Sequence, residues 1–118
     1  MRIRWHVLTV GLGLLVAGGL AEPAWATMAN LTSFKQAYPT VSPVSCKMCH
    51  QGAIGKKGDL NAYGQALQKS KAPADAKKLT ADDFRAVEKA DSDGDGVSNV
   101  DELKAGTNPG DPASVLKK

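Results

Sequence analysis

Two cysteines and a histidine fall within five residues of this chain, in the run Cys46-Lys47-Met48-Cys49-His50. The chain holds no other cysteine, and its only other histidine, His6, lies close to the N-terminus. A spacing of three residues brings the two thiols to one side of a helical turn, and the imidazole follows directly after them. The fold therefore has to present three chemically reactive side chains from one short segment.

This spacing is the attachment signature of a c-type haem. Cys46 and Cys49 would form thioether bonds to the haem, and His50 would bind the iron as the proximal ligand. A zinc site is the first alternative, but it needs four ligands and the motif supplies three. A redox dithiol would need a strand-helix unit around the motif, where the sequence instead has prolines. A structural disulfide is the remaining alternative, and it would give the histidine no role. We interpret the motif as the site of one covalent haem c.

Residues 1–26 are predicted to be a signal peptide. Arg2 and Arg4 precede an apolar stretch at residues 7–20, and Ala24-Trp25-Ala26 offers the small residues of a cleavage site. An uncleaved membrane anchor is the alternative, but the stretch is short for a span and is interrupted by four glycines. We expect cleavage after Ala26 and export to the periplasm or the exterior of a bacterial cell, with no membrane span in the mature chain.

The 92 residues from Thr27 onward are enough for one domain but contain little material for a core. A covalent haem would supply apolar surface around which such a chain can pack. We predict one all-α domain, with a haem-binding part at residues 27–78 and a second part at residues 79–118. The aromatic residues after the predicted cleavage site are Phe34, Tyr38, Tyr63 and Phe84.

The pattern of apolar residues is helical, with no long alternating stretch. Leu31 to Tyr38 predicts a short helix that ends before Pro39. Asp59 is expected to cap a second helix that runs to about Ser70, with one apolar face against the haem: Leu60, Tyr63, Gly64 and Leu67. A capping box at Thr80 predicts a third helix that continues to about Ala90.

Residues 91–102 match the twelve-residue EF-hand calcium loop at its diagnostic positions. Gly96 stands at the sixth position, where the loop makes its sharp turn. Clustered carboxylates repel one another unless a cation neutralises them, so we predict one bound Ca²⁺. The alternative is an acidic turn without metal. The predicted ligands are the side chains of Asp91, Asp93, Asp95, Asn99 and Glu102 and the carbonyl of Val97.

This loop departs from paired EF-hands, because Ser98 replaces the usual aliphatic residue at position eight and the chain holds no second loop. Together with Gly106-Thr107-Asn108-Pro109, it resembles the calcium repeats of bacterial extracellular proteins, akin to thrombospondin type 3 and dockerin modules. The resemblance implies a permanent structural clamp and not a calcium sensor.

Taken as a whole, the chain resembles a small exported monohaem c-type cytochrome. The resemblance implies electron transport, with haem iron cycling between its ferrous and ferric states. Familiar soluble cytochromes c place a methionine downstream of the motif as the sixth iron ligand, but no methionine follows Met48. Met28 is one candidate for this position, and a lysine or the N-terminal amine is another. A vacant sixth position would instead suit a protein that binds or senses small ligands, and in a third interpretation haem serves only as the core of a calcium-dependent structural module.

Charge is divided along the chain. Residues 47–78 hold seven lysines and two acids, whereas residues 91–111 hold six acids and one lysine. The lysines would steer an acidic redox partner toward the haem, unless they are simply a solvated face. The sequence offers no pattern for nucleic-acid binding and no acid, base and nucleophile set that would indicate an enzyme. It leaves the oligomeric state open.

Overall fold

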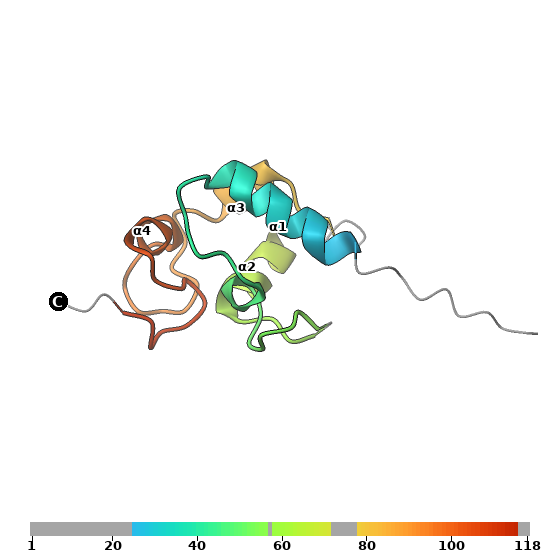
Figure 1. Cartoon of the computed structure of the whole chain (residues 1–118). Helices are drawn as coiled ribbons and strands as arrows, with labels where there is room; N and C mark the ends of the chain where they lie inside the picture. Colours follow the sequence, from blue (N-terminus) through green and yellow to red (C-terminus); the bar gives the residue numbers. More distant parts are fainter. Residues whose placement is uncertain (1–24, 57, 72–77, 116–118) are drawn as a thin grey trace, which may run out of the picture.

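The computed structural model describes residues 25–56, 58–71 and 78–115, which form four α-helices and a single turn of 3-10 helix (Figure 1). Within these ranges there is no strand, only an isolated antiparallel bridge between His50 and Leu60. The predicted all-α class is therefore confirmed. The elements in chain order are α1 (Trp25–Ala37), η1 (Cys46–Met48), α2 (Ala62–Ser70), α3 (Ala81–Ala86) and α4 (Asn99–Ala105).

Most of the predicted signal peptide lies outside the described residues, so the structure does not test it. α1 begins at Trp25, earlier than the predicted Leu31, and continues through the expected cleavage site after Ala26. None of the helices in the described ranges has the length and apolar character needed to cross a membrane.

Two further predicted helix boundaries are wrong. Asn61, not Asp59, caps α2: its side-chain oxygen accepts the Gly64 N–H at 2.9 Å. Asp59 instead accepts the Gly52 N–H at 3.0 Å and so closes the loop that follows the cysteine motif. α3 ends at Ala86, before the predicted Ala90. Carbonyls beyond its end, those of Glu88 and Ala90, accept backbone N–H groups from the start of α4.

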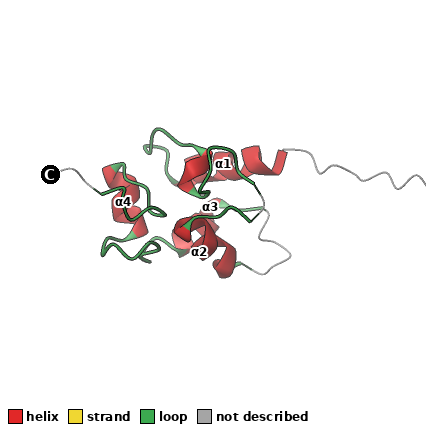
Figure 2. Ribbon diagram, turned by 90° about the horizontal axis from the view of Figure 1, so that it is seen from below, coloured by secondary structure: helices red, strands yellow, loops and turns green. Residues whose placement is uncertain are grey.

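α3 packs against both α1 and α2, and α4 lies to one side of this group in both views (Figures 1 and 2). The centre of the packing is aromatic. Phe34 packs edge to face on Phe84, with ring centroids 5.3 Å apart. The Phe34 ring also packs against the Tyr38 ring, at a centroid distance of 5.2 Å. Buried apolar side chains from all four α-helices and the segments between them form one cluster: Phe34, Tyr38, Tyr63, Leu67, Leu79, Phe84, Val87 and Leu103.

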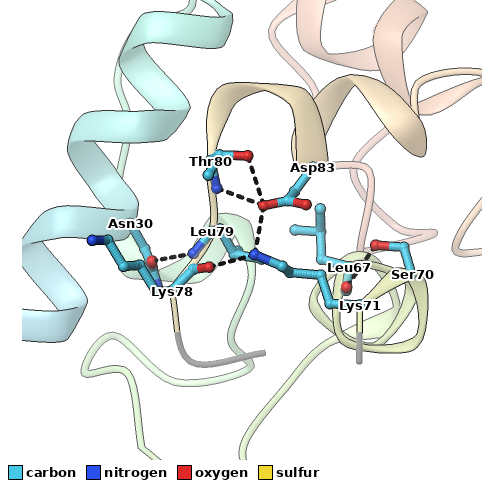
Figure 3. A network of polar contacts seen from close by, with 8 residues as sticks. All are labelled: Asn30, Leu67, Ser70, Lys71, Lys78, Leu79, Thr80 and Asp83. Carbon is cyan, nitrogen blue, oxygen red and sulfur yellow. Dashed lines mark hydrogen bonds and ion pairs between the residues drawn. The ribbon is translucent and has the colours of Figure 1, made fainter. Parts of the chain in front are cut away.

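A polar network joins the middle of α1 to the end of α2 and the start of α3 (Figure 3). The Asp83 carboxylate accepts the backbone N–H and the hydroxyl of Thr80, which is the predicted capping box. The Lys71 ammonium at the end of α2 lies 2.9 Å from the same carboxylate. These contacts lower the pKa of Asp83, the Thr80 N–H contributing most. On the α1 side, the Asn30 side-chain oxygen accepts the Leu79 N–H at 2.9 Å. The network therefore fixes where α3 begins relative to its two neighbours.

The backbone of α2 lies directly against the cysteine motif at Gly64. A Cβ atom built on Gly64 would stand 2.1 Å from the carbonyl oxygen of Cys49 and 3.0 Å from the Leu60 side chain. No side chain fits in that space, so the close contact between α2 and the motif depends on glycine.

Gly64→Ala should therefore destabilise the fold by about 1–3 kcal/mol, because the added methyl group would push α2 away from Cys49. In an exposed helix the same substitution would stabilise by about 1 kcal/mol, so the direction is diagnostic. Gln65→Ala, at the exposed neighbouring position, should change stability by less than about 0.5 kcal/mol. Urea unfolding of the three proteins measures both effects, and a stabilised Gly64→Ala would contradict the close packing.

Candidate functional site

A cavity of about 410 Å³ opens between α1, the cysteine motif, α2 and the start of α3. Its wall is mostly apolar. α2 contributes Gly64 and Leu67, with Leu60 just before it, as the expected apolar face predicts. Tyr63, which was expected on the same face, instead lies fully buried in the core. The cavity residues that also belong to the predicted haem site are Cys46, Cys49, His50 and Met28.

Both cysteines are free thiols and line this cavity from the turn η1. Burial, and to a smaller extent the neighbouring Cys46, raises the pKa of the Cys49 thiol to about 12. A redox dithiol needs a thiol with a lowered pKa, because the thiolate is the reactive form. The environment of Cys49 therefore argues against a thioredoxin-like reactive thiol at this position.

The His50 imidazole lies close to the loop that follows the motif. A Cβ atom on Gly55 would stand 3.0 Å from Nε2 of His50, so the ring packs closely against the glycine. The other ring nitrogen, Nδ1, is buried and has no hydrogen-bond partner among the described residues. A buried polar atom without a partner costs free energy, which is typical of a functional group whose partner is a ligand.

Met28 extends from α1 at the rim of the cavity, and its side chain is 66% exposed. It therefore shares a cavity with His50, as a sixth iron ligand would require, but most of its surface is open to solvent. Met48 also lines the cavity, from its place between the two cysteines.

Asn61 is a site residue that the sequence analysis missed. Its buried side-chain amide donates to the carbonyl oxygens of Lys47 and Met48, each at 3.0 Å, while its oxygen caps α2. Its backbone N–H donates to the Cys49 carbonyl at 3.0 Å. One residue thus fixes the carbonyls of the cysteine turn to the first turn of α2. Only its place just before a helix, where Asn is a favoured cap, could have signalled it.

In the acidic loop, aspartate carboxylates accept hydrogen bonds from backbone N–H groups of the same loop. Asp91 accepts the N–H groups of Gly94 at 2.7 Å and Gly96 at 2.8 Å, and Asp95 accepts that of Val97 at 2.8 Å. Gly96 has a φ of +93°, so the predicted sharp turn at the sixth position is confirmed. Carboxylate oxygens of Asp91, Asp93 and Asp95 lie within 4.8 Å of one another, close enough to share one cation.

Glu102, at the twelfth position, reaches the same loop from α4. Its side chain is only 2% exposed, and Oε2 has no hydrogen-bond partner, as is also true of Asp93 Oδ2. Burial together with the charges of Asp93 and Asp95 raises the pKa of Glu102 to about 7. Burial is also the main reason why the pKa of Asp93 is raised. Two buried carboxylate oxygens without partners, beside two further carboxylates, match the donor set that Ca²⁺ prefers.

Asn99 is placed differently from the other predicted ligands. It is fully buried, and its side-chain oxygen accepts the Ser92 N–H at 3.1 Å. Its amide nitrogen donates to the Val87 carbonyl and to the Ser92 hydroxyl, both at 2.8 Å. In this arrangement Asn99 ties the loop together across its base. Val97, the sixth predicted ligand, lies at the surface of the loop.

Comparison with known proteins gives no family for the chain: no family model, curated protein or solved structure matches it.

The raised pKa of Glu102 predicts how the calcium-free protein responds to pH. Between the ordinary glutamate value of 4.5 and about 7, the folded state binds the Glu102 proton more tightly than the unfolded state. The free energy of unfolding without Ca²⁺ should therefore fall as pH rises through this range. Added Ca²⁺ should remove the fall, because it neutralises the carboxylate.

Glu102→Gln should flatten this pH dependence in chelator and should also weaken Ca²⁺ binding. Asp101→Asn, which changes an exposed carboxylate on the same helix, serves as the control and should leave the slope in place. Thermal unfolding from pH 4.5 to pH 8 measures the slope, and calcium-free stability that rises with pH would contradict the electrostatics of the loop.

Proposed function

We propose that this protein is an exported electron carrier with one covalent haem c, stabilised by one Ca²⁺. The observation that carries the proposal is the apolar cavity onto which Cys46, Cys49 and His50 all open. A haem supplies an iron centre that accepts and releases single electrons. The residues of this chain would attach such a group, bind its iron and surround it with an apolar wall.

The residues around the cavity fit a haem. Two free thiols line the cavity, and Nδ1 of His50, on the same cavity, is buried without a hydrogen-bond partner among the described residues. The helix faces opposite are apolar, with Leu31 and Phe34 from α1 and Leu67 from α2. A low-polarity wall excludes water from the iron, which tunes its potential. The cysteines would hold the group by thioether bonds and His50 would bind the iron.

The surface near the motif supports a role in transfer between proteins. Lys47 and Lys56 are exposed, one within the motif and the other on the loop against which His50 lies. Positive charge at this edge would steer an acidic redox partner, which raises the rate of encounter more than the affinity. No substrate chemistry is required of the chain, so we propose a carrier and not an enzyme.

A second function is favoured by one observation, the high exposure of Met28 at the cavity rim. If this side chain does not reach the iron, the sixth position is open, and the protein would bind or sense small ligands instead of only carrying electrons. The two functions differ in whether Met28 forms a bond to the iron, and spectroscopy distinguishes them.

Covalent attachment is tested by co-expression with a c-type maturation system and export. The wild type should be red and keep its haem through acid-acetone extraction, and Cys46→Ser/Cys49→Ser should lose all of it, because no thioether bond can then form. Ser45→Ala, next to the motif and also on the cavity wall, is the matched control and should keep its haem. Extraction of the haem from the wild type would contradict covalent attachment.

Met28→Leu tests the sixth ligand. If Met28 binds the iron, the variant should change from six-coordinate to five-coordinate marker bands in the resonance Raman spectrum, and the ferrous form should gain rapid carbon monoxide binding. Met48→Leu, the same change on the same cavity, should alter neither. A wild-type protein that already binds carbon monoxide rapidly, with Met28→Leu unchanged, would favour the ligand-binding function.

A further inference from the structure

The segment after α4 connects the acidic loop to the cysteine motif. Gly106 ends α4 in the left-handed region, with a φ of +79°, and turns the chain back toward the loop. The Thr107 N–H then donates to the Glu102 carbonyl at 2.9 Å, and its hydroxyl lies 3.4 Å from Oε1 of the Glu102 carboxylate. Thr107 therefore contacts the backbone and the side chain of the last predicted calcium ligand.

The next residue reaches the cysteine motif. The Asn108 side-chain amide donates to the Lys47 carbonyl at 3.0 Å, and its oxygen accepts the Gly110 N–H at 3.0 Å. Gly110 in turn lies on the Asn61 side chain so closely that a Cβ atom there would stand 2.3 Å from Cγ of Asn61. Pro109 between them is fully buried. Residues 107–110 are thus packed at both ends, against Glu102 and against the haem motif.

The Lys47 carbonyl lies between the two cysteines, and it accepts two hydrogen bonds, one from Asn61 and one from Asn108. A carbonyl oxygen has two lone pairs, so both are used. The peptide between Lys47 and Met48 is therefore held by Asn61, the N-cap of α2, on one side and by Asn108, in the segment after α4, on the other. The orientation of this peptide sets where the two thiols and the following histidine stand.

We propose that residues 107–110 couple calcium binding to the rigidity of the haem-attachment turn. This inference rests on the proposed function, since it takes Ca²⁺ at Glu102 and haem at Cys46, Cys49 and His50. Without Ca²⁺, the buried carboxylates repel one another and loosen Glu102, which releases Thr107 and then Asn108 from Lys47. Ca²⁺ reverses each step and stiffens the turn that carries His50. Because such coupling is reciprocal, a turn locked by its haem also raises the affinity for Ca²⁺.

Amide hydrogen exchange in the haem-loaded protein tests the coupling. The His50 N–H donates to the Cys46 carbonyl and the Asn61 N–H to the Cys49 carbonyl, so both amides report opening of the turn. A chelator should speed their exchange at least about fivefold in the wild type, the effect of losing one hydrogen bond. In Asn108→Asp, which keeps the acceptor oxygen and loses the donor, exchange should already be fast with Ca²⁺ present and should respond little to the chelator.

Gln65→Glu is the matched control, because it also converts an amide that donates to a backbone carbonyl, that of Leu60, into a carboxylate. It should exchange and respond as the wild type does. Thr107→Val removes the hydroxyl contacts with Glu102 at the other end of the segment but keeps the backbone hydrogen bond, and it carries the test if Asn108→Asp does not fold. Thr107→Ser, which keeps the hydroxyl, should restore the wild-type response.

Calorimetry with Ca²⁺ on the same samples tests the calcium site separately from the coupling. No heat of binding in the wild type would mean that the proposed calcium site is wrong, and the coupling falls with it. Measurable binding with unchanged exchange at His50 and Asn61 would overturn the coupling alone. An equal response to the chelator in the wild type and in Asn108→Asp would also overturn it, since the signal would then not pass through Asn108.

Discussion

The Asn61 side chain makes the interaction on which the rest of this structure depends. It is a buried amide that satisfies two carbonyls of the cysteine turn and one N–H of α2. Buried polar groups are costly unless paired, and here one side chain pairs three of them. The missing side chain at Gly64 lets α2 approach the Cys49 carbonyl, and Gly110 lets the C-terminal segment close over the amide. The turn, the helix and the segment after α4 therefore meet around one residue.

The clustered carboxylates of the acidic loop carry an electrostatic cost that a proton or a cation would reduce. Asp91, Asp93 and Asp95 stand together, and Glu102 is buried beside their charge with a pKa raised to about 7. Hydrogen bonds from the loop backbone hold three of these carboxylates in place but do not neutralise them. Oε2 of Glu102 has no hydrogen-bond partner among the described residues. The chain thus brings three carboxylates close enough to share one cation, while their repulsion is left uncompensated by protein charges of the loop.

What the sequence predicts well in this protein is local. The Thr80 capping box and the turn at Gly96 follow from residues a few positions apart, and both are present. The cap at Asn61 was assigned to Asp59 instead, because both residue types favour caps and only the contact with the cysteine turn distinguishes them. The bond from Asn108 to Lys47 joins distant parts of the chain. No spacing rule predicts it, since it depends on how the two parts pack.

The cavity and the small core both follow from the small number of large apolar residues in the chain. The buried apolar cluster includes four residues that also line the cavity, so one face of the core borders the cavity: Phe34, Leu67, Leu79 and Phe84. Side chains that line the cavity have fewer neighbouring atoms on that side and so lose part of the dispersion energy of a packed core. The proposed haem, held at Cys46 and Cys49, would supply those contacts and would then be part of the core as well as a redox centre. If so, substitutions that change the packing around the cavity would also change the surroundings of the iron.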